Sequence, residues 1–215
     1  MFTGIVAAVG RIVTISPLAE NYGLRLRIDA GPLDLSDVAL GDSIAINGAC
    51  MTVVAKDGSH FDIDVSRESL LRTVGLSEPG PVNLEKALTL SQVLGGHLVS
   101  GHVDGHGHVA KFEAVGESWH LAIDAPLDLA RFFAYKGSVT VQGVSLTVNR
   151  VEDLEQACRI HINLIPHTLQ QTTLATLGVG SAVNLEVDLI ARYCERLLQF
   201  KPTIEPIPGS LASEP

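Results

Sequence analysis

The chain carries four short sequence patterns twice, in the same order in each half. The pairs are TGIV at 3–6 with SGHV at 100–103, GACMTV at 48–53 with GVSLTV at 143–148, ESLLRT at 68–73 with HTLQQT at 167–172, and VNLE at 82–85 and again at 183–186. The second copy follows the first by 95 to 101 residues, a drift that insertions in loops would cause. Four collinear matches indicate a duplicated domain, because this period is far longer than that of a solenoid repeat.

Each copy has the pattern of short strands rich in valine and isoleucine, separated by turns. The expected strands are 4–14, 25–29, 43–47, 52–55 and 60–65 in the first half, and 107–112, 120–124, 138–142, 146–151 and 159–164 in the second. Residues 56–59 (KDGS) have the composition of a hairpin turn. Many short strands with glycine-rich turns indicate a small closed barrel or a sandwich in each half.

Few segments favour helix. Short helical turns are expected at 38–41, 67–73 and 166–172, and the joint between the halves is expected at 84–94. After the second repeat, apolar pairs at 189/190, 193/194 and 197/198 form one stripe of an amphipathic helix, with Asp188 as its N-cap. This stripe would pack either on its own barrel or against another copy of the chain. Residues 201–215 contain four prolines and are expected to form a loose tail.

The composition argues against several classes of protein. With 46% hydrophobic and 18% charged residues, the chain is too apolar to be disordered, and it has no run of the ~18–20 apolar residues that a membrane helix needs. A net charge of -9 without a lysine or arginine run argues against nucleic-acid binding. The N-terminus lacks the features of a secretory signal, and Cys50, Cys158 and Cys194 form no C-x-x-C pair. We therefore expect a cytoplasmic, reducing location without membrane contact.

Four histidines gather at the start of the second half: His97, His102, His106 and His108. In an extended strand the last three would share one face with Asp104, which is the pattern of a candidate metal site. The glycines between them favour a flexible, exposed strand instead. We expect no metal, and a metal-binding barrel stays as an alternative function.

Two polar pairs occupy equivalent places in the repeats. Cys50 and Thr52 match Ser145 and Thr147, and each pair flanks an apolar residue where a strand begins. Residues two apart in a strand point to the same side, so each pair would present two hydrogen-bonding groups to one pocket. Such a pair suits the polar edge of a flat heterocycle, whereas capping of a turn or strand is the alternative role.

Five motifs in the chain are considered together: MFTGIV at 1–6, NGACMTV at 47–53, GGHLVSGHV at 95–103, GVSLTV at 143–148 and LIPHTL at 164–169. In this combination they resemble the motifs of the riboflavin synthase family of the alpha-chain type. The resemblance extends from residue 1 to about residue 200, and it departs at Ala49, where some members carry a second cysteine.

This resemblance implies an all-β fold: two tandem duplicated six-stranded Greek-key β-barrels followed by a C-terminal α-helix. The domains would be an N-terminal lumazine-binding barrel at 1–95, a C-terminal lumazine-binding barrel at 96–187, a trimerisation helix at 188–200 and a flexible tail at 201–215. The implied partners are two copies of the substrate, a homotrimer of this chain and, as a further associate, lumazine synthase. No cofactor and no metal is implied.

The implied reaction is a dismutation of two molecules of 6,7-dimethyl-8-ribityllumazine, the last step of riboflavin biosynthesis. One molecule gives a four-carbon unit to the other, which yields riboflavin and 5-amino-6-(D-ribitylamino)uracil. Each barrel would bind one copy, and the working site would form between the N-terminal barrel of one subunit and the C-terminal barrel of a neighbour. Fixed orientation of two reactants can be worth ~7–11 kcal/mol of barrier. A non-catalytic relative that only binds lumazine or flavin is the alternative.

The resemblance assigns catalytic roles to His102 as proton carrier and to Cys50 and Ser145 as nucleophile or water-positioning groups, with Asp188 assisting. The N-terminal barrel would bind lumazine through Gly4, Ile5, Val6, Cys50, Met51, Thr52, Asp64, Val65, Ser66, Arg67, Glu68 and Ser69. The C-terminal barrel would use Gly101, His102, Val103, Lys136, Ser145, Leu146, Thr147, Asn163, Leu164, Ile165, Pro166, His167 and Thr168. Since Ile5 matches His102 in the repeat, the halves would be chemically unequal; which of them holds the donor stays open.

Overall fold

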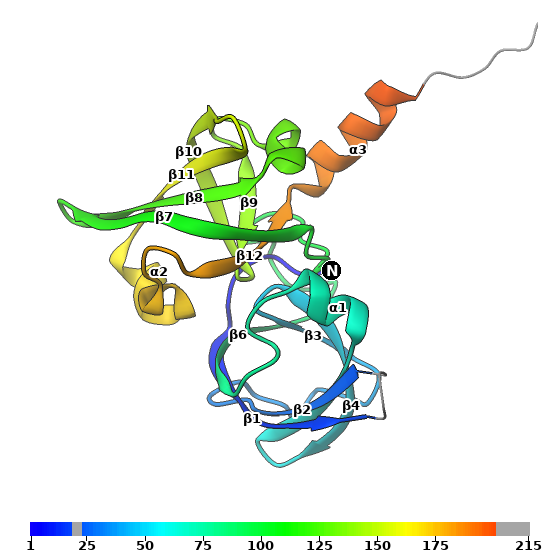
Figure 1. Cartoon of the computed structure of the whole chain (residues 1–215). Helices are drawn as coiled ribbons and strands as arrows, with labels where there is room; N and C mark the ends of the chain where they lie inside the picture. Colours follow the sequence, from blue (N-terminus) through cyan, green and yellow to red (C-terminus); the bar gives the residue numbers. More distant parts are fainter. Residues whose placement is uncertain (19–22, 201–215) are drawn as a thin grey trace, which may run out of the picture.

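The computed structural model describes residues 1–18 and 23–200, and it folds them into two closed barrels followed by a helix (Figure 1). The N-terminal barrel consists of β1 (Ala8–Pro17), β2 (Gly23–Asp29), β3 (Ser43–Ile46), β4 (Ala49–Asp57), β5 (His60–Ser66) and β6 (Gly80–Lys86). Its strands close in the order β1-β2-β5-β4-β3-β6. The tail expected at 201–215 lies outside the described residues.

The C-terminal barrel repeats this arrangement strand by strand. It consists of β7 (Gly105–Val115), β8 (Ser118–Pro126), β9 (Ser138–Val141), β10 (Val144–Asp153), β11 (Ala157–Leu164) and β12 (Ala182–Val187). Its circular order β10-β11-β8-β7-β12-β9 matches that of the first barrel when each strand is replaced by its repeat partner. The expectation of two duplicated six-stranded barrels is therefore confirmed.

Each barrel has a core of its own, because alternate residues of its strands point inward. Leu26, Ile28 and Phe61 are fully buried in the first barrel, and Leu121 and Ile123 are fully buried in the second. Along β5 the residues between these buried positions are half-buried or exposed, as the alternation requires.

The first strand begins later than the sequence suggests, and its expected start at residue 4 is wrong. Strand β1 begins at Ala8, and the chain before it crosses to the second barrel, where the Ser145 N–H donates to the Gly4 carbonyl at 2.7 Å. The chain at Gly101 crosses the other way, and its carbonyl accepts the Cys50 N–H at 2.8 Å. The two crossing segments are joined by backbone hydrogen bonds of 2.7 and 3.1 Å between Phe2 and Val99.

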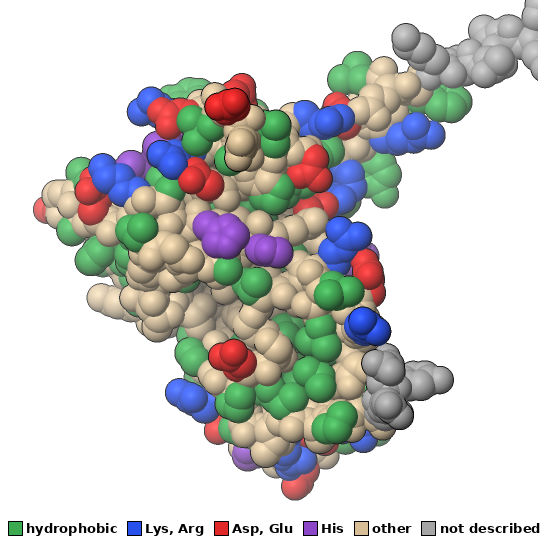
Figure 2. Space-filling model, in the orientation of Figure 1, with side chains coloured by type: hydrophobic (Ala, Val, Ile, Leu, Met, Phe, Trp, Pro, Cys, Tyr) green, Lys and Arg blue, Asp and Glu red, His purple; other side chains and the backbone are tan. Residues whose placement is uncertain are grey.

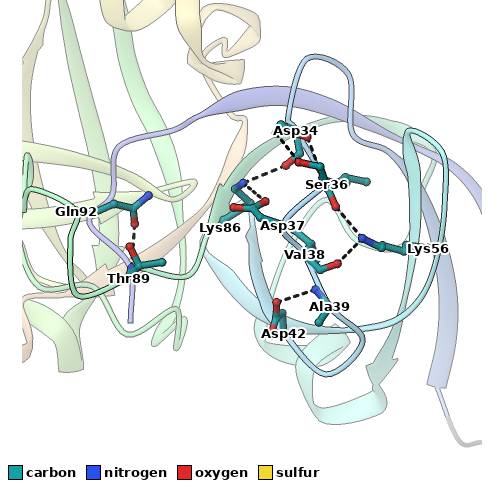
Figure 3. A network of polar contacts seen from close by, with 11 residues as sticks. Asp34, Ser36, Asp37, Val38, Ala39, Asp42, Lys56, Lys86, Thr89 and Gln92 are labelled. Carbon is teal, nitrogen blue, oxygen red and sulfur yellow. Dashed lines mark hydrogen bonds and ion pairs between the residues drawn. The ribbon is translucent and has the colours of Figure 1, made fainter.

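The connection between β2 and β3 contains turns rather than the helical turn expected at 38–41. Two lysines hold this loop, as Figure 3 shows. The Lys56 ammonium donates to the carbonyls of Leu35 (2.8 Å) and Val38, and the Lys86 ammonium donates to the Asp34 carbonyl (3.0 Å) and the Asp37 carboxylate (2.6 Å). The second barrel uses a short 3-10 helix, η1 (Leu127–Phe132), for the same connection, where the sequence pattern predicts no helix.

The other short helices lie where they were expected. Helix α1 (Arg67–Arg72) and helix α2 (Pro166–Gln171) each follow the fifth strand of their barrel, and α2 continues into η2 (Thr173–Thr176). The Ser66 hydroxyl caps α1 by accepting the Ser69 N–H at 3.1 Å.

Two asparagines from the repeated VNLE pattern join the barrels. Asn83 donates to the Gln142 carbonyl at 2.8 Å and accepts the Thr173 N–H at 2.8 Å. Asn184 donates to the Asn47 carbonyl at 3.0 Å and accepts the Val74 N–H at 2.7 Å. Because each asparagine reaches the other barrel in the same way, the contact has approximate twofold symmetry.

Helix α3 (Leu189–Gln199) points away from both barrels (Figure 1). The Asp188 carboxylate accepts the Ile190 N–H at 2.9 Å, so the expected N-cap is confirmed. Its apolar stripe does not pack on its own barrel: Ile190, Leu197 and Leu198 are 63%, 73% and 81% exposed. Figure 2 shows hydrophobic side chains on this projecting helix. Among the described residues no helix is both long and apolar enough to span a membrane.

Candidate functional site

A hollow of about 180 Å³ opens on the N-terminal barrel beside Cys50. Its walls come from the start of β4, from Glu68, Ser69 and Arg72 of α1 with the following Thr73, and from the crossing segment at 101–103. His102 lines this hollow together with Cys50. The assignment of Gly101, His102 and Val103 to the C-terminal barrel is therefore wrong, because the crossing carries them to the N-terminal one.

A buried carboxylate holds this crossing segment in place. Glu186 of β12 is 2% exposed, and it accepts the Ser100 N–H at 2.7 Å, the Ser100 hydroxyl at 2.6 Å and the Gly101 N–H at 3.0 Å. Burial raises the pKa of the Glu186 carboxyl, and the hydrogen bonds from Ser100 and Gly101 partly oppose that rise. Since His102 follows directly, Glu186 determines where this histidine lies.

The other half has the same device. Glu85 of β6 accepts the Thr3 N–H at 2.6 Å, the Thr3 hydroxyl at 2.7 Å and the Gly4 N–H at 3.0 Å. Burial raises the pKa of this carboxyl as well, against the same kind of hydrogen bonds. The segment that follows lies against the second barrel, where Val6 packs on the core. Gly4 and Val6 therefore lie against the C-terminal barrel and not against the N-terminal barrel to which they were assigned. Ile5 between them is half exposed and lines a hollow with Glu85 and Lys86 of β6.

At the C-terminal barrel, the Ser145 hydroxyl is covered by a short strap of the linker. His97 Nδ1 lies 2.7 Å from Ser145 Oγ, and His97 Nε2 lies 3.3 Å from Thr140 Oγ1. The strap passes so close that a Cβ on Gly96 would lie 2.1 Å from the Thr3 carbonyl oxygen and 2.9 Å from Ser145 Cβ. Burial lowers the pKa of His97, so the ring is neutral at pH 7 and can accept a proton.

His97 is the candidate functional residue that sequence reasoning missed. The sequence pattern groups it only with the metal-like histidines, because it lies outside the four repeated patterns. The structure thus gives each barrel one histidine beside its polar pair: His102 beside Cys50, and His97 beside Ser145. The sequence suggested that only one half has a histidine, since Ile5 matches His102. In the structure both barrels have one, and they differ because His97 is hydrogen-bonded and His102 is exposed.

Lys136 stands in a left-handed backbone conformation, with φ of 65°. The equivalent residue of the first barrel is Gly41, with φ of 94°, and both N–H groups donate to the following strand in the same way, to Val148 and Val53. A lysine is disfavoured at such φ, so its presence points to a role for its side chain. The ammonium donates to Asn149 at 3.2 Å on the outward face of β10.

The other residues expected to bind the substrate fall into two groups, those with buried side chains and those with outward-facing side chains. Those of Met51, Val65, Leu146 and Leu164 are buried in the two cores, so only their backbone could face a ligand. Asp64 is held by Arg25 in a two-point ion pair of 2.7 and 2.9 Å, and the hydrogen bond from Arg25 lowers its pKa. The outward-facing residues are Thr52, Ser66, Arg67, Thr147, Asn163, Ile165, Pro166 and His167. Thr168 follows them in α2 and is half-buried.

The alternative metal site does not assemble from its expected residues. Asp104 precedes β7 and is bound by Arg192 of α3 at 2.7 and 2.8 Å and by the Val187 N–H at 2.9 Å. His106 and His108 meet only edge to face, with ring centroids 5.8 Å apart. Within 1–18 and 23–200, no three ligating side chains gather as a metal would require.

Comparison with known proteins matches the two halves to one family model, the lumazine binding domain, at residues 3–87 and 100–188. The riboflavin synthase of Photobacterium phosphoreum is 44% identical over 204 residues, covering 92% of this chain and 89% of the relative. The riboflavin synthase of Mycobacterium bovis is also 44% identical, covering 93% and 98%. Among solved structures, LumP in complex with 6,7-dimethyl-8-(1'-D-ribityl) lumazine has a TM-score of 0.72 at 26% identity, covering 87% of this chain and 99% of that one.

Proposed function

The chain belongs to the riboflavin synthase family, and from this premise we propose how its two barrels divide the work. The reaction is the dismutation of two 6,7-dimethyl-8-ribityllumazine molecules to riboflavin and 5-amino-6-(D-ribitylamino)uracil. We propose that one lumazine lies on the Cys50 side of the N-terminal barrel and the other on the Ser145 side of the C-terminal barrel.

The observation that carries this proposal is the pairing of one histidine with one small polar side chain at each barrel. A neutral imidazole takes up and releases protons near pH 7, which suits loss of a proton from a lumazine methyl group. His102 is exposed at the open hollow, so it is the better placed proton acceptor for a ligand. Cys50 and Ser145 would position the heterocycle or a water molecule, or add to it as nucleophiles.

The two lumazines must meet, and we propose that they do so across a subunit interface. The hollow of about 180 Å³ is smaller than the ~300–1,000 Å³ of typical small-molecule pockets, so a second surface is needed to enclose a ligand. The exposed apolar stripe of α3 supports self-association, because apolar side chains at such exposure favour burial against a partner. We propose a homotrimer in which the N-terminal site of one subunit faces the C-terminal site of the next, and a cytoplasmic location.

The test is to incubate the purified protein with 6,7-dimethyl-8-ribityllumazine and to follow both products. We expect two substrate molecules to be consumed for each riboflavin and each diaminouracil product formed. Binding of the lumazine without turnover would instead identify a non-catalytic binder.

A further inference from the structure

Asp104 links the crossing segment that carries His102 to helix α3, and the proposed function makes no use of this link. The two oxygens of the Asp104 carboxylate accept from the Arg192 guanidinium at 2.7 and 2.8 Å, and one of them also accepts the Val187 N–H at 2.9 Å. A two-point bond between a guanidinium and a carboxylate fixes both a distance and an angle. The orientation of α3 and the position of Asp104 therefore depend on each other.

The crossing segment is anchored at both of its ends. Glu186 holds its start through the hydrogen bonds described above, and Asp104 holds its end, where the Asp104 N–H also donates to the Leu185 carbonyl at 2.9 Å. Between the two anchors lie His102 and Val103, and both line the hollow of the N-terminal barrel. Because each residue of an extended chain spans only ~3.3–3.6 Å, a displacement of Asp104 is passed on to His102.

The first half of the chain has the backbone part of this anchor but not the carboxylate. Ala7 matches Asp104 in the repeat, and its N–H donates to the Leu84 carbonyl at 2.9 Å, just as the Asp104 N–H donates to Leu185. Alanine has no side-chain acceptor, and β6 leads into the linker to β7, whereas β12 leads into α3. The carboxylate thus occurs in the half that ends in the helix, and the shared barrel fold does not require it.

Ion pairs, rather than apolar packing, hold α3 on its own barrel. No residue of α3, which the structure describes along its whole length, is buried. Arg192 pairs with Asp104, and one turn later Glu195 accepts from Arg131 of η1 at 2.9 Å. The side chains of Arg192 and Arg131 are 37% and 53% exposed, and ion pairs of such exposure stabilise by only ~0–1 kcal/mol each. A single chain therefore holds α3 weakly.

The charged face and the apolar stripe of α3 are different faces of the helix. Asp188, Arg192 and Glu195 follow one another at the spacing of one helix face, and all three are half-buried against the barrel. Ile190 and Leu197 lie on the other face and are exposed. A second copy that packs on the apolar stripe would thus fix the helix without displacing either ion pair.

We propose that Asp104 is a positioning residue that couples association through α3 to the place of His102 in the N-terminal hollow of the same chain. Association holds α3 in one orientation, Arg192 then keeps the Asp104 carboxylate in place, and the crossing segment presents His102 to the hollow. The proposal rests on the proposed function, which gives His102 and the self-association of α3 their roles, and it adds the connection between them.

The first test compares the two ion pairs of α3. Arg192→Met and Arg131→Met each remove one of them, but only the first pair touches the crossing segment. The readout is the ring Cε1–H signal of His102 in NMR spectra of protein with 13C-labelled histidine, assigned by its loss in His102→Gln. At concentrations where sedimentation gives the same mass for all variants, we expect the signal to move in Arg192→Met, to stay in Arg131→Met, and to return in Arg192→Lys.

The second test is kinetic. Asp104→Asn keeps an oxygen for the Val187 N–H but loses the charge that holds Arg192, and it should lower kcat for riboflavin formation about tenfold, the size of one lost hydrogen bond. Arg192→Met should lower kcat by a similar factor, whereas Arg131→Met should leave it unchanged. Calorimetry with 6,7-dimethyl-8-ribityllumazine should show unchanged binding at the C-terminal site in all three variants.

The third test joins the two ends of the link in a double-mutant cycle. Leu197→Glu places a charge on the exposed apolar stripe and should both weaken association in sedimentation and move the His102 signal. In the Arg192→Met background the same change should weaken association but move the signal no further, because the link is already broken.

Three results would overturn the coupling: a His102 signal that Arg192→Met leaves in place, equal losses of kcat in Arg192→Met and Arg131→Met, or additive shifts in the cycle. Asp104→Asn and Arg192→Met alter opposite ends of the same link, so a folding defect in one leaves the other decisive. Failure of the proposed function would look different, because the unaltered protein would then form no riboflavin, while the NMR and sedimentation measurements need no lumazine.

Discussion

The two barrels share strand order, bulges and crossing segments, yet their polar pairs are presented differently. The Cys50 pair borders an open hollow with an exposed histidine, whereas Ser145 is covered by His97 and the Gly96 strap. The duplicated fold therefore provides two similar binding surfaces. The linker makes them unequal, because its residues Gly96 and His97 cover only the C-terminal one. This inequality is what a reaction between two identical molecules requires, since one must lose a four-carbon unit and the other must accept it.

The largest effect is expected from the two buried carboxylates. Glu186→Gln should lower the free energy of unfolding by about 3 kcal/mol, because buried donors of Ser100 and Gly101 lose a charged acceptor. It should also displace His102 and abolish lumazine binding at the N-terminal site alone. Glu85→Gln is the matched variant, and it should remove binding at the C-terminal site alone. Urea unfolding measures the free energy of unfolding, and calorimetric titration with lumazine measures binding at each site. Loss of the same site in both variants would contradict the claim that each carboxylate holds a segment that crosses to the opposite barrel.

The next largest effect is expected from the two histidines beside the polar pairs. His97→Gln and His102→Gln are each expected to lower the rate of riboflavin formation roughly 100-fold, the usual size of a proton-transfer contribution. Because burial lowers the pKa of His97, its neutral form persists below pH 6.5, and the rate should fall only as the pH drops through that lowered pKa. An unchanged rate in His97→Gln would show that this residue transfers no proton and only covers Ser145.

The C-terminal barrel should also be the more sensitive to acid. His97, His120 and His161 all belong to it, and burial lowers the pKa of each. A histidine with a folded pKa below its unfolded value contributes stability that is complete above pH 6.5 and is lost as the pH falls through the folded pKa. The only tryptophan, Trp119, packs on this barrel, so its fluorescence in urea at pH 7.5 and 5.5 measures the loss. Replacing the three histidines by glutamine should flatten that dependence.

The smallest effect is expected at the left-handed position. Lys136→Gly should raise the free energy of unfolding by about 1 kcal/mol through relief of the backbone, while it raises KM. Gly41→Lys is the matched change in the other barrel, where a Cβ has open space, so it should cost about the same through the backbone alone. Equal KM values in Lys136→Gly and the unaltered protein would show that the lysine does not touch the substrate.

The repeat and the strand pattern predicted two similar β domains, each a barrel or a sandwich, and the family resemblance selected six-stranded barrels. The short helices after the fifth strands were also expected, and the apolar stripe at 189–198 predicted the C-terminal helix. The repeat could not predict the crossing, because matching Gly4 to Gly101 says nothing about which barrel each lies against. That choice depends on long-range hydrogen bonds to Glu85 and Glu186, which no local pattern reveals. His97 escaped detection for a related reason: it lies in the linker, outside the four repeated patterns. The site residues and the domain boundaries stay predictions.

Mixing two inactive chains tests most directly whether barrels of neighbouring subunits work together. One chain carries Cys50→Ala with His102→Gln and the other carries Ser145→Ala with His97→Gln, so each retains one intact site. After unfolding and refolding together, about a quarter of the interfaces should pair two intact sites, and riboflavin formation should return to about a quarter of the unaltered rate. Activity no higher than that of either chain refolded alone would contradict a site shared between subunits.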